Sequence, residues 1–294
     1  RSTTLPDLKQ LTINEYLSEV RSIVYPFEPL DNTYDEFQDI SAQVFRKTTE
    51  TDNRDPNITK IGDTYISVLS VSSLPKRSDI SLTNMLVGDP MGSTKQVGCP
   101  YFINCTIIIP DTQDENTKID FDYAQTYDTA TPWAKKFQPK LVDRLEGLEL
   151  LRNATKRGEV PCRLFFNVVL FSKDKQKLPR ISTVLQGYYK SLGLVLVPDS
   201  KIVLPLFWNT LPLYASVESL KNTSRTSRMT TVHAATFAPM FSDFQNLRRN
   251  FSQIYYTRRG NLYGFEPMSG QNHNGMIFGS SGDGKSVSGQ NFLL

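Results

Sequence analysis

Hydrophobic residues recur along the chain with two periods, and each period predicts one kind of secondary structure. The stripe formed by Tyr16, Leu17 and Val20 has the helical period, and Thr12 and Glu15 have the spacing of a capping box. A helix is therefore predicted at about 13–24. Runs of β-branched and aromatic residues predict four strands, at 64–71, 101–109, 164–171 and 194–197.

Helical periodicity is most regular between the second and third of these strands. Its apolar positions are Trp133, Phe137, Leu141, Leu145, Leu148 and Leu151. Thr131-Pro132 marks the start of this helix and Gly158 its end, while Pro139 separates or kinks the first turns. We interpret the apolar stripe as a face that packs into the core, in preference to a groove for a partner. A further helix is predicted at 181–192.

The order of these elements, with strands and helices in alternation, predicts the fold class. We expect an α+β amino-terminal domain in which an antiparallel or mixed sheet carries helices on one face. The segment Lys221–Met229 (KNTSRTSRM) is polar and basic and lacks apolar periodicity. We interpret it as a linker near a domain boundary, in preference to a phosphate-binding patch. The predicted domains are 1–235, for docking and assembly, and 236–294, the incomplete start of a P-loop ATPase domain. The second is expected to supply the first strand, P-loop and helix of a RecA-like α/β fold.

One motif near the C-terminal end carries chemistry. The apolar segment Met276-Ile277-Phe278, predicted as a strand, precedes a match to the pattern GxxxxGK[ST], and a helix is predicted to begin around Val287. Strand, glycine-rich loop and helix form the context of a P-loop (Walker A motif), whose backbone N–H groups converge on the β-phosphate of a nucleotide. The candidate nucleotide-binding residues are Gly279, Ser280, Ser281, Gly282, Asp283, Gly284, Lys285, Ser286 and Val287.

Individual side chains of the motif have distinct expected roles. Lys285 reaches the β- and γ-phosphates and the Ser286 hydroxyl coordinates Mg²⁺, so ATP and Mg²⁺ are the expected cofactors. The carboxylate of Asp283 would repel phosphate oxygens, so its side chain is expected to point outward. The alternative is a Gly/Ser-rich loop with a stray lysine. It is disfavoured because a chance match in a chain of this length occurs on the order of once in a hundred.

Composition and charge narrow the function classes. The 33 Lys and Arg residues against 30 Asp and Glu leave a net charge of +3 without a run of five like charges, so neither a nucleic-acid-binding arm nor a polybasic anchor is expected. No apolar run approaches the length of a membrane-spanning helix. Three cysteines without a CxxC spacing indicate a reducing compartment. Two histidines forty residues apart disfavour a zinc site or a histidine-based triad.

The segments around the P-loop resemble one family. The runs at 238–244 (APMFSDF), 259–262 (RGNL) and 272–274 (NHN) precede the loop in an order that looks like the entry to the motor domain of TraC, the conjugative type IV secretion ATPase, and its relatives. Segments 62–75 and 204–212 resemble the amino-terminal domain of the same family. The resemblance spans most of the chain and is specific near its C-terminal end.

This resemblance implies a cytoplasmic ATPase, peripheral at the inner membrane, that works as an oligomer with inner-membrane components of a conjugation or type IV secretion machine. The chain starts without Met and ends on an apolar run at 291–294, so we interpret it as a piece of a longer protein. No Walker B carboxylate, catalytic Glu or arginine finger follows the loop here, so no catalytic residue is assigned. The complete protein is expected to be an ATPase, and the 294-residue chain alone is expected to be inactive.

Two alternatives remain open. In the first, the α+β domain is a non-catalytic structural or partner-binding module, and a nucleotide is only a scaffold ligand. In the second, the P-loop belongs to a DNA-translocating motor, which would favour a basic channel that a net charge of +3 does not suggest. Sequence-specific binding to nucleic acid is not expected. A downstream apolar strand with an acidic end would separate the transport ATPase from the structural module.

Overall fold

The computed structural model describes residues 10–28, 34–46, 49–75, 78, 82–88, 97–215, 217–238, 253–256, 262–266, 276, 278–282 and 284–291. The chain divides into two compact units. Unit 1 comprises Arg1–Gly88 and Lys95–Met240, and unit 2 comprises Asp89–Thr94 and Phe241–Leu294. The independent folding of residues 1–235 stays a prediction.

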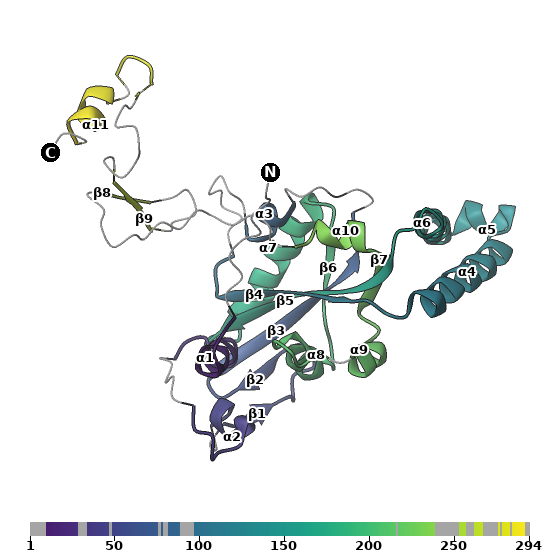
Figure 1. Cartoon of the computed structure of the whole chain (residues 1–294), viewed down its shortest axis with the longest axis horizontal. Coiled ribbons are helices and arrows are strands. Elements are labelled where there is room, and N and C mark those ends of the chain that lie inside the picture. Colours follow the sequence, from purple (N-terminus) through teal and green to yellow (C-terminus); the bar gives the residue numbers. More distant parts are fainter. Residues whose placement is uncertain are drawn as a thin grey trace. The chain divides into compact units, whose positions relative to one another are not determined.

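Within the described residues, unit 1 is built on one antiparallel sheet of seven strands (Figure 1). The strands are β1 (Thr51–Asp52), β2 (Thr59–Ile61), β3 (Thr64–Ser73), β4 (Tyr101–Ile108), β5 (Pro161–Ser172), β6 (Val195–Pro198) and β7 (Thr226–Thr230). Five of them follow the order β1-β2-β3-β5-β4, while β6 pairs with β3 and β7 pairs with β5. The four predicted strands are confirmed as β3, β4, β5 and β6, because β-branched and aromatic runs fit a pleated, buried surface.

Strands β3 and β5 form the centre of the sheet, where Val68 lies opposite Val169. Because successive side chains of a strand point to opposite faces, the even-numbered and odd-numbered residues of β5 face different layers. Leu170 enters one hydrophobic core and Phe171 enters a second one. Both faces of the sheet are therefore apolar and need cover.

Helices cover both faces of the sheet, so the prediction of helices on one face is wrong (Figure 1). The core of Leu170 is shared by α3 (Leu82–Leu86), α7 (Lys177–Ser191) and α10 (Thr231–Ala235). The core of Phe171 is shared by α1 (Ile13–Val24), α2 (Ile40–Val44), α8 (Val203–Thr210) and α9 (Val217–Thr223). The physical reason is the unbroken apolar run of β5, which is typical of a strand buried on both faces. The helices predicted at 13–24 and 181–192 are confirmed as α1, with its capping box, and α7.

Between β4 and β5 the chain leaves the sheet as a helical hairpin, at the right of Figure 1. It consists of α4 (Thr112–Thr129), α5 (Pro132–Phe137) and α6 (Pro139–Lys156). Leu145 and Leu151 of the predicted apolar stripe are buried, but Trp133 and Phe137 are exposed. The core-facing interpretation is therefore wrong for these two aromatic residues. The chain breaks at Pro139, so α5 does not continue the face that α6 buries.

The segment interpreted as a linker, Lys221–Met229, is also reassigned. Its second half belongs to β7, which pairs with the first half of β5 and places Met229 opposite Cys162. Ladder hydrogen bonds need no apolar side chains, and the arginines of this segment are held by acidic partners instead, so the composition alone was misleading.

Unit 2 contains, among its described residues, a two-stranded antiparallel sheet and one short helix. The strands are β8 (Gln253–Tyr256) and β9 (Leu262–Phe265), with Tyr255 opposite Tyr263. The helix is α11 (Lys285–Asn291), which follows the glycine-containing loop.

Candidate functional site

The predicted nucleotide-binding residues lie on the loop that leads into α11, and all of them except Asp283 belong to the described residues. Gly282 and Gly284 have φ angles of 94° and 75°, in the left-handed region that favours glycine. Apart from the adjoining residues, nothing lies within 4 Å of a Cβ at either position, so the backbone conformation and not crowding requires glycine. The helix predicted after the loop is present and begins at Lys285.

The side chain of Lys285 folds back over this loop. Its Nζ atom donates to the backbone oxygen of Gly279 at 2.5 Å and to that of Ser280 at 2.7 Å. The ammonium group therefore lies beside the first residues of the motif, and its hydrogen bonds join the end of the loop to its start. The described residues from Gly279 to Ser286 are exposed, apart from the half-buried Lys285, so a solute can reach them.

The apolar segment before the loop does not form the predicted strand at the two positions described. Met276 and Phe278 are 84% and 85% exposed and belong to no strand. A buried strand needs neighbouring strands, and none of the described residues of unit 2 pairs with this segment. Among the described residues of unit 2, no strand leads into the loop.

Unit 1 contains the three cysteines of the chain, Cys99, Cys105 and Cys162. No group of three His, Cys, Asp or Glu side chains among the described residues could hold a metal ion. The cysteines are free thiols, and burial raises the pKa of Cys105 and of Cys162 to about 11. The nucleophilic thiolate form of these two residues is therefore scarce near neutral pH.

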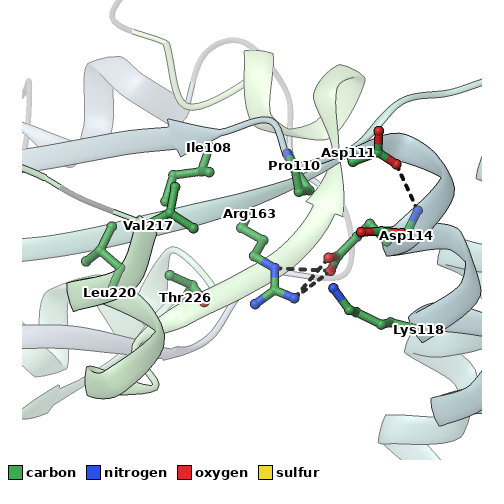
Figure 2. A pocket seen from close by; sticks show the side chains of 10 residues that line it. Ile108, Pro110, Asp111, Asp114, Lys118, Arg163, Val217, Leu220 and Thr226 are labelled. Atoms are coloured by element: carbon green, nitrogen blue, oxygen red, sulfur yellow. Dashed lines mark hydrogen bonds and ion pairs between the residues drawn. The ribbon is translucent and has the colours of Figure 1, made fainter.

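A cluster of charged side chains lies at the root of the helical hairpin (Figure 2). Glu115 of α4, which is 1% exposed, accepts hydrogen bonds from Nε and Nη2 of Arg163 at 3.1 and 2.9 Å. Nε of Arg228 lies 3.0 Å from the same carboxylate, and its guanidinium also contacts Asp122. A buried carboxylate requires such partners because it has lost its hydration. The cluster ties α4 to β5 and β7.

A cavity of about 220 Å³ opens beside this cluster (Figure 2). Apolar side chains from β4 and α9 meet charged side chains from α4 in its wall, and the lining residues are Ile108, Pro110, Asp111, Asp114, Glu115, Lys118, Arg163, Val217, Leu220 and Thr226. Asp111 accepts hydrogen bonds from two backbone N–H groups and so caps α4. Because Glu115 and Arg163 are paired with each other, we interpret the cavity as part of the hairpin's attachment and not as a reaction centre.

A second group of polar side chains lies near the middle of β5. There the pairing of β5 changes from β3, which contacts its second half, to β7, which contacts its first half. Buried Asp199 accepts hydrogen bonds from the Ser70 hydroxyl and, at 2.7 Å, from Nε of Arg225. This carboxylate therefore joins β3, the end of β6 and the start of β7. Asn167, opposite Ser70 on β5, is fully buried, and neither atom of its amide has a hydrogen-bond partner.

Comparison with protein families settles the assignment of the chain. The family model described as TraC protein matches residues 7–215, which is more than half of the sequence. The chain belongs to the TraC family. Membership implies a role in conjugation or type IV secretion, and it confirms the resemblance inferred from the sequence. A comparison with curated proteins found no match.

The TraC match ends before the glycine-containing loop, so the nucleotide-binding assignment depends on the motif itself and stays a prediction. The sequence analysis named the loop because its residues are contiguous. It missed Glu115, Arg163 and Asp199, whose partners come from distant elements. A weak signal was available for Arg163, since a cation inside an otherwise apolar strand needs a partner.

Proposed function

We propose that this TraC-family protein is the ATP-binding component of a conjugation or type IV secretion machine, and that it energises assembly or transport at the inner membrane. Membership of the TraC family supports the role in a conjugation or type IV secretion machine, and the pattern GxxxxGK[ST] supports the binding of a nucleotide. The observation that carries the proposal is the return of Lys285 onto the backbone of Gly279 and Ser280. The contact supports the proposal because it holds the ammonium group of Lys285 over the loop, and the lysine of a P-loop contacts the β- and γ-phosphates of the nucleotide.

In this proposal the loop binds the phosphates of ATP. Backbone N–H groups of residues 280–286 surround the β-phosphate, and the first turn of α11 adds positive potential. Lys285 exchanges two neutral carbonyl partners for charged phosphate oxygens, and this exchange is favourable because charge-assisted hydrogen bonds are stronger. The hydroxyl of Ser286 is the expected ligand of Mg²⁺.

Unit 1 is proposed to dock the protein on the secretion machine and to contact sister subunits. It contains nearly all the residues of the family match, and its paired charges at Glu115 and Asp199 hold the sheet and the hairpin as one platform. Among the described residues, no helix combines the length and the apolar composition that crossing a membrane requires. We therefore expect the inner-membrane components of the machine to be captured by unit 1 in preference to unit 2.

The test compares ATP binding and hydrolysis by the purified complete protein with those of two variants. Lys285→Ala is expected to abolish hydrolysis and to weaken binding roughly a hundredfold, because two charge-assisted hydrogen bonds of about 1.5 kcal/mol each are lost. Gln290→Ala changes an exposed side chain near the other end of α11 and is expected to behave as wild type.

Other results would contradict the proposal. Equal ATP binding by all three proteins would show that the loop is not the site. ATP bound without hydrolysis by the complete protein would favour the alternative of a structural module with a scaffold nucleotide.

A further inference from the structure

Two aromatic side chains are exposed on α5, which lies at the far end of the helical hairpin; Figure 1 shows the position of this helix. Helix α5 lies at the turn between α4 and α6, and its Trp133 and Phe137 are 69% and 60% exposed. Their ring centroids lie 5.1 Å apart. The Thr131 hydroxyl caps α5 by accepting a hydrogen bond from the Ala134 N–H, and Pro132 occupies the first turn. The aromatic pair is therefore held by a capped helix.

The same tip concentrates positive charge. Residues 130–142 contain Lys135, Lys136 and Lys140 and no acidic residue, and the acidic residues that flank this stretch are Asp128 and Asp143. All three lysines are exposed, and none forms an ion pair with another residue in the described part of the chain. The α6 segment that follows has mixed charge, so the excess of cations is confined to the surroundings of the aromatic pair.

The combination distinguishes a lipid surface from a protein groove. Lysine is depleted from the centres of protein interfaces because its ammonium group is strongly hydrated. At a bilayer surface the ammonium groups stay hydrated among lipid phosphates, while the aliphatic stems and aromatic rings enter the apolar boundary. Tryptophan is enriched at this depth because its ring is apolar and its N–H donates.

We propose that the α5 tip binds the headgroup region of an anionic lipid bilayer, with Trp133 and Phe137 inserted and Lys135, Lys136 and Lys140 facing lipid phosphates. The proposal deepens the proposed function, on which it rests for the identity of the membrane. The hairpin can transmit such a contact because its root is fixed by the ion pairs of Glu115. An 18-residue helix such as α4 is about 27 Å long, which sets the tip well away from the sheet.

Vesicle binding by the 294-residue chain tests the proposal, with tryptophan fluorescence as the probe. The chain has two tryptophans, and Trp208 is partly buried beside Phe45, so Trp208→Phe leaves Trp133 as the sole reporter. Vesicles of phosphatidylcholine and phosphatidylglycerol in equal parts are expected to shift its emission to the blue and to carry the chain on flotation. Binding should fall as salt is raised, because exposed charges are screened.

Two sets of variants distinguish the insertion of the aromatic side chains from the attraction of the lysines to anionic lipid. Trp133→Ser with Phe137→Ser is expected to abolish flotation. Replacing the three lysines by glutamine is expected to weaken it roughly a hundredfold, at about fivefold for each lysine near the surface. The matched control, Phe121→Ser with Leu150→Ser, removes side chains that are 67% and 63% exposed on the same hairpin and should float as wild type. Circular dichroism checks that each variant is folded.

Several outcomes would overturn the inference. These are no emission shift with anionic vesicles, equal binding to vesicles of phosphatidylcholine alone, or loss of binding in the Phe121 and Leu150 control. Capture of an inner-membrane protein by the tip, without vesicle binding, would assign the surface to a protein instead. ATP binding by the complete protein does not involve the tip. A failure here with ATP binding intact therefore leaves the proposed function standing.

Discussion

Arg163 and Glu115 meet fork to fork, and their two hydrogen bonds of 3.1 and 2.9 Å join β5 at the centre of the sheet to the first turn of α4. The Glu115→Gln variant keeps the shape of the side chain but removes the charge that Arg163 and Arg228 share. We expect it to lower the free energy of unfolding of the chain by about 3 kcal/mol, because two partly buried guanidinium groups lose their carboxylate. Urea unfolding followed by circular dichroism measures the change.

The exposed ion pair between Asp120 and Arg152 on the same hairpin supplies the control. Asp120→Asn is expected to change the free energy of unfolding by less than about 1 kcal/mol, since solvent screens this pair. Equal losses in the two variants would contradict the special role of the buried carboxylate.

The sequence predicted the elements of this sheet better than it predicted their partners. Strand β5 could be recognised because its apolar run is continuous, and α1 because its capping box is local. Strand β7 could not, because it is held by ladder bonds to β5 and by ion pairs at Arg225 and Arg228, and neither interaction leaves a periodic pattern. Helix α4 was missed for a related reason, since few of its residues are buried.

Asn167 offers a test of the interior. Its amide is fully buried without a hydrogen-bond partner, and such an amide costs about 1–3 kcal/mol of desolvation. We therefore expect Asn167→Val to raise the free energy of unfolding by about 1 kcal/mol. The matched control is Asn104→Val, directly opposite on β4, where the amide accepts a hydrogen bond from Thr106 and stability should fall. A loss of stability in Asn167→Val would show that this amide has a partner in solution, such as a buried water.

His233 predicts a pH dependence of stability. Burial of the imidazole lowers its pKa below the ordinary value of 6.5, so the unfolded chain binds this proton more readily than the folded one. As far as His233 is concerned, the free energy of unfolding is therefore highest above about pH 6.5, where the imidazole is neutral in both states. It decreases as the pH falls below that value, because the unfolded chain takes up the proton first. Urea unfolding at several pH values measures this dependence. The free energy of unfolding should decrease less on acidification in His233→Gln than in wild type. Identical pH profiles would contradict the assignment to His233.

In the candidate site, too, the features formed by residues adjacent in the sequence could be predicted, and those that depend on packing against other elements could not. The candidate nucleotide-binding loop could be named because eight contiguous residues match one pattern, and Gly284, one of the two glycines that the pattern prescribes, has a left-handed φ. The exposure of Trp133 and Phe137 could not be predicted, because helical periodicity identifies an apolar face but does not say whether another layer covers it.

Conjugative transfer tests the central claim most directly. Donor cells in which the complete protein carries Lys285→Ala are expected to transfer no more than donors that lack the protein, because the loop can no longer hold the β- and γ-phosphates. Gln290→Ala donors, with the same α11 and an intact Lys285, should transfer as wild type. Immunoblots establish that all variants accumulate equally. Wild-type transfer frequency from the Lys285→Ala donors would contradict the claim that ATP bound at this loop powers the machine.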